Sequence, residues 1–364
     1  MISGERNEYA PERVSPPGET LQDLLEERGM SQAELAERTG RPRKTINEIV
    51  QGKSAITPET ALQLERVLSV PARFWNNREA NYREHLARKE DETELGKSLG
   101  WLRDLPVSFM IKKRWIEKGA RRVDQSRVVL AFFGVSSPAH WSQMFKSQRA
   151  HFRQSSAFAI KAGAVAAWLR QGELQARDTV TDAFEKETFL LVLQEIRLLT
   201  KEPPAVFEEK LPRLCARAGV AVVFVPPPPG CRACGATQWV SPTKALIQLS
   251  LRYKTDDQLW FTFFHEAGHI LKHSKRTVFL EGPKPRQGRM EDEANRFASE
   301  ILIPQTDYLA FVEGGNFSRS AITEFASSIG VAPGIVVGRL QHDQHLPWNS
   351  PCSSLKRSFR WVDE

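Results

Sequence analysis

The chain has 364 residues, a formal net charge of +7 and an apolar content of 41%, so two or three domains with packed cores are expected. No run of about 18 apolar residues occurs, and the first residues lack an apolar signal core, so neither a transmembrane helix nor export is predicted. Four cysteines are too few for a disulfide framework in a chain of this length, which favours a reducing cytoplasm.

The positive charge is concentrated in one part of the chain. Residues 91–170 hold 14 Lys and Arg against 6 Asp and Glu, whereas residues 1–90 hold 14 against 15. The densest stretch, residues 111–122, has the sequence IKKRWIEKGARR. It predicts either a patch that meets phosphate or an acidic protein, or a solvated basic helix face with no specific role. Both interpretations stay open.

The N-terminal part begins with a predicted loose arm, residues 1–18, which is polar and rich in proline. Residues 19–90 then have a helical period with short breaks at glycines. Ser31 and Glu34 have the spacing of a capping box, which predicts the start of a helix. Gly40 lies where the turn between the two helices of a helix-turn-helix is expected. The next helix would expose side chains toward phosphates and base edges: Arg43, Lys44 and Asn47.

This part of the chain, over about residues 15–90, resembles the Xre/Cro-like helix-turn-helix of HigA-type antitoxins. The motifs that carry the resemblance are LLEERG at 24–29, SQAELA at 31–36, KTINEI at 44–49 and AITPETA at 55–61. The resemblance implies binding to operator DNA, usually as a homodimer, and a toxin as a further partner. The residues that it implies in DNA binding are Gln32, Arg43, Lys44, Thr45, Asn47 and Lys53.

Two features depart from this family. Pro42 stands just ahead of the recognition helix where the family commonly has serine, so a hydroxyl cap and its phosphate contact are lost. The slight excess of acidic residues over residues 1–90 is also unusual for a strong DNA-binding domain. An interpretation in which this fold binds only protein therefore stays open.

Residues 91–200 are predicted to form a helical, basic middle domain in which no chemical motif stands out. Residues 201–364 are predicted to form a domain with both strands and helices. Strand signals occupy residues 220–225, 236–240 and 245–253. The third strand alternates apolar and polar side chains, and a substrate added as a further strand would neighbour Leu246, Gln248 and Ser250.

Helices are predicted to follow these strands. The first begins near residue 256, with Asp256 or Asp257 as its N-cap, and the second runs from about Arg289 to Leu302 and stops before Pro304.

The first of these helices carries an H-E-x-x-H pattern, formed by His265, Glu266 and His269. Histidines four residues apart lie on one face of a helix, where a single tetrahedral Zn²⁺ can bind both. Glu266 follows the first histidine and is positioned to activate a water molecule. The pattern predicts zinc-dependent peptide hydrolysis.

A catalytic zinc site needs a third protein ligand, and the second helix offers two. Glu291 and Asn295 are four residues apart, so Glu291 can bind the metal while Asn295 accepts the second N–H of a ligating histidine. Glu293 is the rival ligand, about 200° around the helix from Glu291. We favour Glu291.

This part of the chain, over about residues 205–345, resembles the ImmA/IrrE family of gluzincin-like metallopeptidases. The motifs that carry the resemblance are WFTFFHEAGHILKH at 260–273 and EDEANRFASEILIP at 291–304. The resemblance implies a Zn²⁺ endopeptidase that cleaves regulatory proteins, often helix-turn-helix repressors. It also implies the roles of four residues, with His265, His269 and Glu291 as ligands and Glu266 as general base.

Other side chains are weaker candidates, and each is more often structural. His273 lies two helical turns from His265, which would suit an outer-shell or oxyanion role. Cys231 and Cys234 have the spacing of a redox or second metal pair. The remaining candidates for stabilising an oxyanion are Tyr253, Tyr308, His342 and His345.

The sequence therefore predicts a mainly α chain, α+β overall. It has an N-terminal helix-turn-helix bundle, a helical middle domain and a C-terminal zincin-like α+β domain with a small sheet. The favoured function is a DNA-binding transcriptional regulator fused to a zinc metallopeptidase that cleaves a repressor or antitoxin-like protein. One alternative is a HigA-like antitoxin or autorepressor whose zinc domain is a sensor or inactive. Another is a peptidase whose DNA-binding domain is vestigial.

Overall fold

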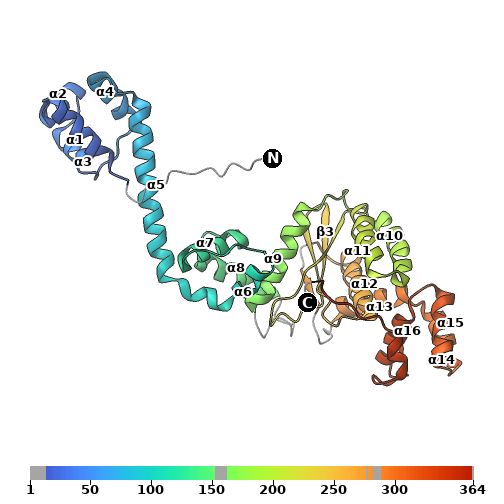
Figure 1. Cartoon of the computed structure of the whole chain (residues 1–364). Helices are drawn as coiled ribbons and strands as arrows, with labels where there is room; N and C mark the ends of the chain where they lie inside the picture. The colour runs from blue at the N-terminus through green and yellow to red at the C-terminus, as the bar shows by residue number, and fades with distance from the viewer. Residues whose placement is uncertain (1–13, 152–161, 276–277, 282–287, 363–364) are drawn as a thin grey trace. The chain divides into compact units, whose positions relative to one another are not determined.

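The chain divides into two compact units, Met1–Ser98 and Leu99–Glu364, each with its own hydrophobic core. Figure 1 draws the whole chain, and the computed structural model describes residues 14–151, 162–275, 278–281 and 288–362. Side chains of residues 145–151 are outside this description.

The sequence predicts domain boundaries near residues 18, 90 and 200. Of the loose arm, residues 1–13 lie outside the described residues, and Pro17 and Gly18 already belong to the first helix. One continuous helix, α5 (Ala72–Lys97), passes through residue 90. Residues 99–364 form one unit, because helix α9 (Ala162–Asp178) packs against the sheet formed by later residues.

The N-terminal unit is a bundle of helices. They are α1 (Pro17–Glu27), α2 (Gln32–Thr39), α3 (Arg43–Val50), α4 (Pro58–Leu68) and α5 (Ala72–Lys97). Their apolar faces bury a shared core around the fully buried Trp75. The expected cap is present, since Ser31 Oγ accepts a hydrogen bond from the Glu34 N–H at 3.1 Å. Gly40, with a φ of 70°, ends α2 in the left-handed conformation that glycine adopts without strain.

The second unit begins with helices that precede the sheet. They are η1 (Leu99–Asp104), α6 (Val107–Lys112), α7 (Arg122–Phe133), α8 (Pro138–His151), α9 (Ala162–Asp178), α10 (Lys186–Leu198), η2 (Leu199–Lys201) and α11 (Pro204–Ala216). The strands are β1 (Val220–Phe224), β2 (Gly235–Ser241), β3 (Lys244–Leu249) and β4 (Phe279–Leu280). The remaining helices are α12 (Asp256–Lys272), α13 (Arg289–Leu302), α14 (Gln305–Glu313), α15 (Arg319–Ile329), α16 (Pro333–His342) and η3 (Pro351–Leu355).

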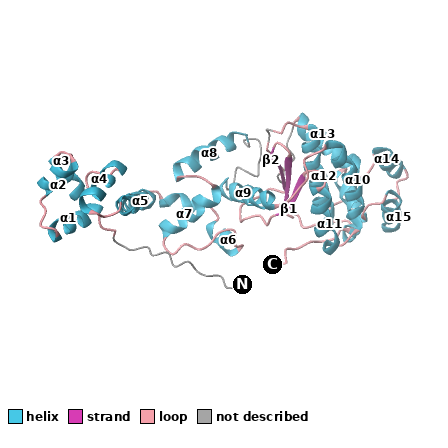
Figure 2. Cartoon of the chain, turned by 90° about the horizontal axis from the view of Figure 1, so that it is seen from above, coloured by secondary structure: helices cyan, strands magenta, loops and turns pink. Residues whose placement is uncertain are grey.

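The four strands form a mixed sheet in the order β1-β3-β2-β4. Strand β3 pairs in parallel with β1 and antiparallel with β2, so it is central. The sheet lies between α9 on one face and α11 and α12 on the other, as both views show (Figures 1 and 2). Ile247 and Leu249 enter the core that α12 shares, whereas the Gln248 amide on the α9 face donates to the Trp168 carbonyl at 2.7 Å.

This topology corrects two expectations about the third strand. Leu246, Gln248 and Ser250 are all fully buried, because both faces of β3 are covered and both of its edges are already paired. A substrate therefore cannot add beside them as a strand. The strand also ends at Leu249 rather than near residue 253, since Leu251 and Lys254 adopt left-handed φ angles of 53° and 56°.

The start of α12 also differs from the expectation. Its N-cap is Thr255, and Asp256 and Asp257 lie in the first helical turn. The Asp256 carboxylate accepts the Arg357 N–H at 3.1 Å, and Lys356 pairs with Asp257 at 2.7 Å. The C-terminal segment thus holds the beginning of this helix.

Within the described ranges, no single helix is long and apolar enough to cross a membrane. Only the pair α15 and α16, bent by 112° at its break, meets that test of length and composition.

We predict that Gly18→Ala destabilises the N-terminal unit. A Cβ at this position would overlap the backbone carbonyls of Ile49 and Val50, and such overpacking typically costs about 1–3 kcal/mol. Hydrogen exchange of α1 and α3 peptides measures the free energy of unfolding of this unit. Gly96→Ala is the matched control, because nothing lies within 4 Å of its Cβ position and alanine favours a helix. Equal protection of both variants would contradict the packing described for Gly18.

Candidate functional site

Helix α12 is buried over most of its surface. Trp260, Phe263 and Phe264 are fully buried in the main core, and these aromatic side chains fix the helix against the sheet and its neighbours. On the same helix, His265 and His269 are 3% and 2% exposed. The two imidazoles are therefore held in a protein interior, where polar groups need partners.

Three side chains from α12 and α13 converge at one point. The Nε2 atoms of His265 and His269 lie 3.0 Å apart. The Oε2 atom of Glu291 lies 3.3 Å from the first and 3.5 Å from the second. Among the described residues, these three form the one group of His, Cys, Asp and Glu side chains close enough to hold a metal ion. Glu293, the rival ligand, points elsewhere and contacts His273 at 3.2 Å.

The outer nitrogens of both imidazoles have hydrogen-bond partners. His265 Nδ1 donates to Asn295 Oδ1 at 2.9 Å. His269 Nδ1 lies 3.0 Å from His273 Nδ1, and His273 Nε2 donates to Glu293 Oε2 at 3.2 Å. Because the carboxylate only accepts, a neutral His273 accepts from His269. In the neutral form of each imidazole this leaves the Nε2 lone pair facing Glu291, the tautomer that metal binding needs.

Burial and nearby carboxylates act in opposite directions on the two imidazoles. Burial lowers the pKa of His269 to about 4. Burial also lowers the pKa of His265, but the hydrogen bond with Glu291 and the charges of Glu281 and Glu266 outweigh it and raise the pKa to about 9. The surroundings therefore favour a positive charge on His265 and the neutral form of His269.

Glu266 is fully buried, and neither of its carboxylate oxygens has a hydrogen-bond partner among the described residues. Burial raises the pKa of this carboxyl to about 8. Gly235 at the start of β2 makes the arrangement sterically possible, because a Cβ there would lie 2.8 Å from Glu266 Oε1. The Thr237 hydroxyl donates to the Glu266 backbone carbonyl at 3.2 Å and ties the helix to the same strand.

The residues present fit a zinc ion. Zinc bonds of about 2.0–2.2 Å in a tetrahedron place ligand atoms about 3.3–3.5 Å apart, close to the separations between Glu291 and the two imidazoles. The set of two imidazoles and one carboxylate is a known catalytic zinc set. The unpartnered Glu266 carboxylate adds a buried acceptor that has no partner within the described protein.

The convergent group opens into a cleft of about 570 Å³. Tyr253 and His342, two of the expected oxyanion candidates, line it, whereas Tyr308 and His345 are outside its lining. Sequence reasoning missed one lining residue, Glu281 after β4, which belongs to no recognisable motif. Cys234 before β2, which the sequence offers only as half of a cysteine pair, also lines the cleft. The pairing of β2 with β4 brings both residues there. Other lining side chains are Phe261, Arg339, Trp348 and Lys356.

The cysteine pair is free and buried. Burial raises the pKa of the Cys231 thiol to about 12 and also raises that of Cys234, so neither is a thiolate at neutral pH. In the described part of the chain, these thiols do not belong to a group of metal-binding side chains. The structure therefore gives no support to a redox or second metal role.

The N-terminal unit presents the side chains expected to meet DNA. Arg43, Lys44, Asn47 and Lys53 are exposed, and Thr45 and Gln32 are half-buried. The Asn47 amide donates to Gln32 Oε1 at 3.4 Å, which joins α3 to the start of α2. Helix α3 begins after Pro42 without a side-chain cap, as the sequence predicts.

Comparisons with known proteins match both ends of the chain. The family model described as helix-turn-helix matches residues 21–75, and the peptidase family model described as the IrrE N-terminal-like domain matches residues 235–341. Virulence-associated protein A of Dichelobacter nodosus is 40% identical over 68 residues, which is 18% of this chain and 67% of that protein.

Two solved structures resemble the N-terminal part. One is an addiction module antidote protein of the HigA family from Coxiella burnetii, 30% identical, with a TM-score of 0.22 and coverage of 23% of this chain and 94% of that chain. The other is the antitoxin HigA of Pseudomonas aeruginosa with the higBA promoter, also 30% identical, with a TM-score of 0.22 and coverage of 22% and 90%.

The two family matches coincide with the two structural features described above. The helix-turn-helix match spans the helices that expose Lys44 and Asn47. The peptidase match spans the two histidines, Glu266 and Glu291. The chain therefore combines an N-terminal helix-turn-helix DNA-binding domain with a C-terminal domain of the IrrE N-terminal-like peptidase family.

Proposed function

We propose that the C-terminal domain is a zinc-dependent endopeptidase of the gluzincin type. The observation that carries the proposal is the convergence of His265, His269 and Glu291 beside the buried, unpartnered carboxylate of Glu266. A structural metal site would have four protein ligands and no adjacent base, whereas three ligands with an open cleft suit catalysis.

In this mechanism the protein supplies binding, orientation and proton transfer. His265, His269 and Glu291 would hold the zinc ion, which would supply polarisation of a peptide carbonyl and a lowered pKa of water. Glu266 would accept the proton of the attacking water and pass it to the leaving amine. Asn295 and His273 are positioning residues that orient the imidazoles so that the Nε2 atoms of their neutral forms can bind a metal ion.

We further propose that the chain is a transcriptional regulator whose peptidase acts on a regulatory protein, such as a repressor or an antitoxin. The support is the presence of a DNA-binding domain on the same chain, which would bring the peptidase to a regulated operon. The cleft walls also suit a peptide, since they combine aromatic Phe261 and Trp348 with charged Arg339 and Lys356.

We predict that Glu266→Gln abolishes proteolysis while leaving zinc binding intact. Loss of a general base lowers a rate by about 10²–10⁴-fold, and glutamine has nearly the same volume. Purified repressor and antitoxin-like proteins are the substrates to test, with cleavage followed by mass spectrometry and zinc by atomic absorption. Glu324→Gln on the exposed face of α15 is the control. Equal cleavage by the wild type and Glu266→Gln would refute a catalytic role.

The positioning role of Asn295 leads to a prediction about metal affinity. Asn295→Ala removes the acceptor for His265 Nδ1, and loss of such a partner lowers metal affinity by about 10–100-fold. Competition with a chromophoric chelator measures the zinc dissociation constant. Arg296→Ala, an exposed change on the same helix, should leave that constant unchanged. Equal constants for the two variants would show that Asn295 does not orient the ligand.

For the N-terminal domain we predict separate effects of two exposed residues of α3. Lys44→Gln should weaken binding to all DNA and reduce the slope of log affinity against log salt concentration by about one. Asn47→Ala should lower the binding free energy by about 1–3 kcal/mol on the specific site only. Fluorescence anisotropy with the chain's own promoter and a scrambled duplex separates the two effects. Lys89→Gln on α5, also exposed, is the charge-matched control. Unchanged binding by both α3 variants would favour a domain that binds only protein.

A further inference from the structure

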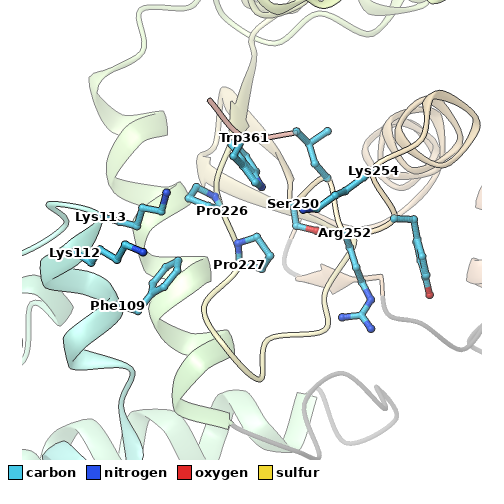
Figure 3. A pocket seen from close by; sticks show the side chains of 11 residues that line it. Phe109, Lys112, Lys113, Pro226, Pro227, Ser250, Arg252, Lys254 and Trp361 are labelled. Carbon is cyan, nitrogen blue, oxygen red and sulfur yellow. The ribbon is translucent and has the colours of Figure 1, made fainter. Parts of the chain in front are cut away.

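A second cavity of the C-terminal unit, of about 600 Å³, lies outside the metal cleft. Its walls come from α6, the loop after β1, the loop after β3 and the C-terminal segment, as Figure 3 shows. Strands β1 and β3 are parallel, with Phe224 paired to Leu249. The residues that follow them, Pro226 and Ser250, therefore lie at the carboxyl ends of adjacent parallel strands, the place where open α/β sheets bind ligands.

The charge of this cavity has one sign. Among the described residues that line it, every charged side chain is a cation: Lys112, Lys113, Arg252 and Lys254. In Figure 3, Lys112 and Lys113 extend from the end of α6 toward the prolines, and Lys254 extends toward the same space from the opposite wall. The Arg252 Nε is buried and has no hydrogen-bond partner within the described chain. Such a set of donors suits an anion with several oxygens, such as phosphate.

Flat apolar surfaces stand beside these cations. Phe109 from α6 and Trp361 from the C-terminal segment line the cavity together with Pro226 and Pro227 (Figure 3). Aromatic faces bind planar rings by stacking, and every nucleobase has such a face. A cavity of this size accommodates a small organic ligand.

The lining offers donors and flat apolar faces. It contains no carboxylate, imidazole or thiol among the described residues. The Ser250 hydroxyl donates to the Ala233 carbonyl at 2.6 Å and is fully buried. The set of cations and flat rings therefore suits the binding of an anion that carries a planar ring.

The loop of residues 250–254 connects this cavity to the metal cleft. Tyr253 lines both, and α12 begins two residues after Lys254. Leu251 and Lys254 in this loop have left-handed φ angles, a conformation that non-glycine residues keep only where the surroundings impose it and that concentrates at functional sites.

We propose that this cavity binds a nucleoside phosphate, with the phosphate held by cations of its lining and the base stacked on Trp361. The ligand would be an effector whose binding is read by the loop that precedes the peptidase helix. The proposal concerns binding and does not depend on the activity of the metal site.

Calorimetric titration of the full chain tests the proposal with adenosine monophosphate, adenosine and inorganic phosphate as separate probes. The expected result is one site per chain that binds the nucleotide at least about tenfold more tightly than either part alone. Lys112→Gln and Arg252→Gln should each weaken nucleotide binding about fivefold or more. Trp361→Ala should weaken it about tenfold, and Trp361→Phe should restore part of the loss.

Two controls of equal charge change separate this cavity from other basic surfaces. Lys210→Gln on α11 and Lys89→Gln on α5 are both exposed and outside the lining, so they should leave nucleotide binding unchanged. Circular dichroism confirms that each variant is folded. Absence of nucleotide binding, equal binding of phosphate alone, or binding that Lys112→Gln and Trp361→Ala do not weaken would each overturn the proposal. A short single-stranded oligonucleotide that binds more tightly than the nucleotide, with the same variants weakened, would assign the same chemistry to a nucleic-acid strand.

Discussion

The metal centre depends on the close approach of α12 and α13. Gly268 makes this approach possible, because a Cβ there would lie 3.2 Å from both Ala294 Cα and Phe297 Cδ1. Ala294 and Ala298 on the facing helix are small and fully buried. The carboxylate of Glu291 reaches the two imidazoles only because the backbones are this near. A larger side chain at either position would separate the helices and with them the ligands.

The burial of α12 also explains why its polar side chains are arranged in pairs. An aromatic core on one side and the sheet on the other exclude water from His265, Glu266 and His269. The imidazole nitrogens therefore have protein neighbours, whereas neither carboxylate oxygen of Glu266 has a partner within the described chain. Trp260 Nε1 and one oxygen each of Asp256 and Asp257 on the same helix also lack one. At the first turn of the helix, the Asp257 carboxylate pairs with Lys356. This matters because a buried charge without a partner is strongly destabilising. The C-terminal segment thereby stabilises the start of the helix that carries the motif.

Features that depend on residues close together in the sequence could be predicted. The bounds of α13, the strand β1 and the cap at Ser31 follow from periodicity, proline and capping spacing within a few residues. Glu291 and Asn295 are four residues apart, so helical geometry alone predicts that they face the same side of their helix. The end of β3 and the places of Glu281 and Cys234 on the cleft could not be predicted, because they depend on which strands pair. Alternating side chains in residues 245–250 indicate one exposed face, whereas α9 covers that face through contacts with residues far away in the chain.

The loop between β3 and α12 joins the two cavities of the C-terminal unit. Its backbone is constrained at both ends: Val225 donates to the Leu249 carbonyl at 2.9 Å, and Phe359 donates to that of Lys254 at 2.6 Å. Between these anchors, Arg252 faces the cationic cavity and Tyr253 borders both cavities. A shift of this short segment cannot be absorbed locally, since Leu251 and Lys254 already hold left-handed conformations. The ligand proposed for the cationic cavity would therefore contact the same short segment that borders the metal cleft.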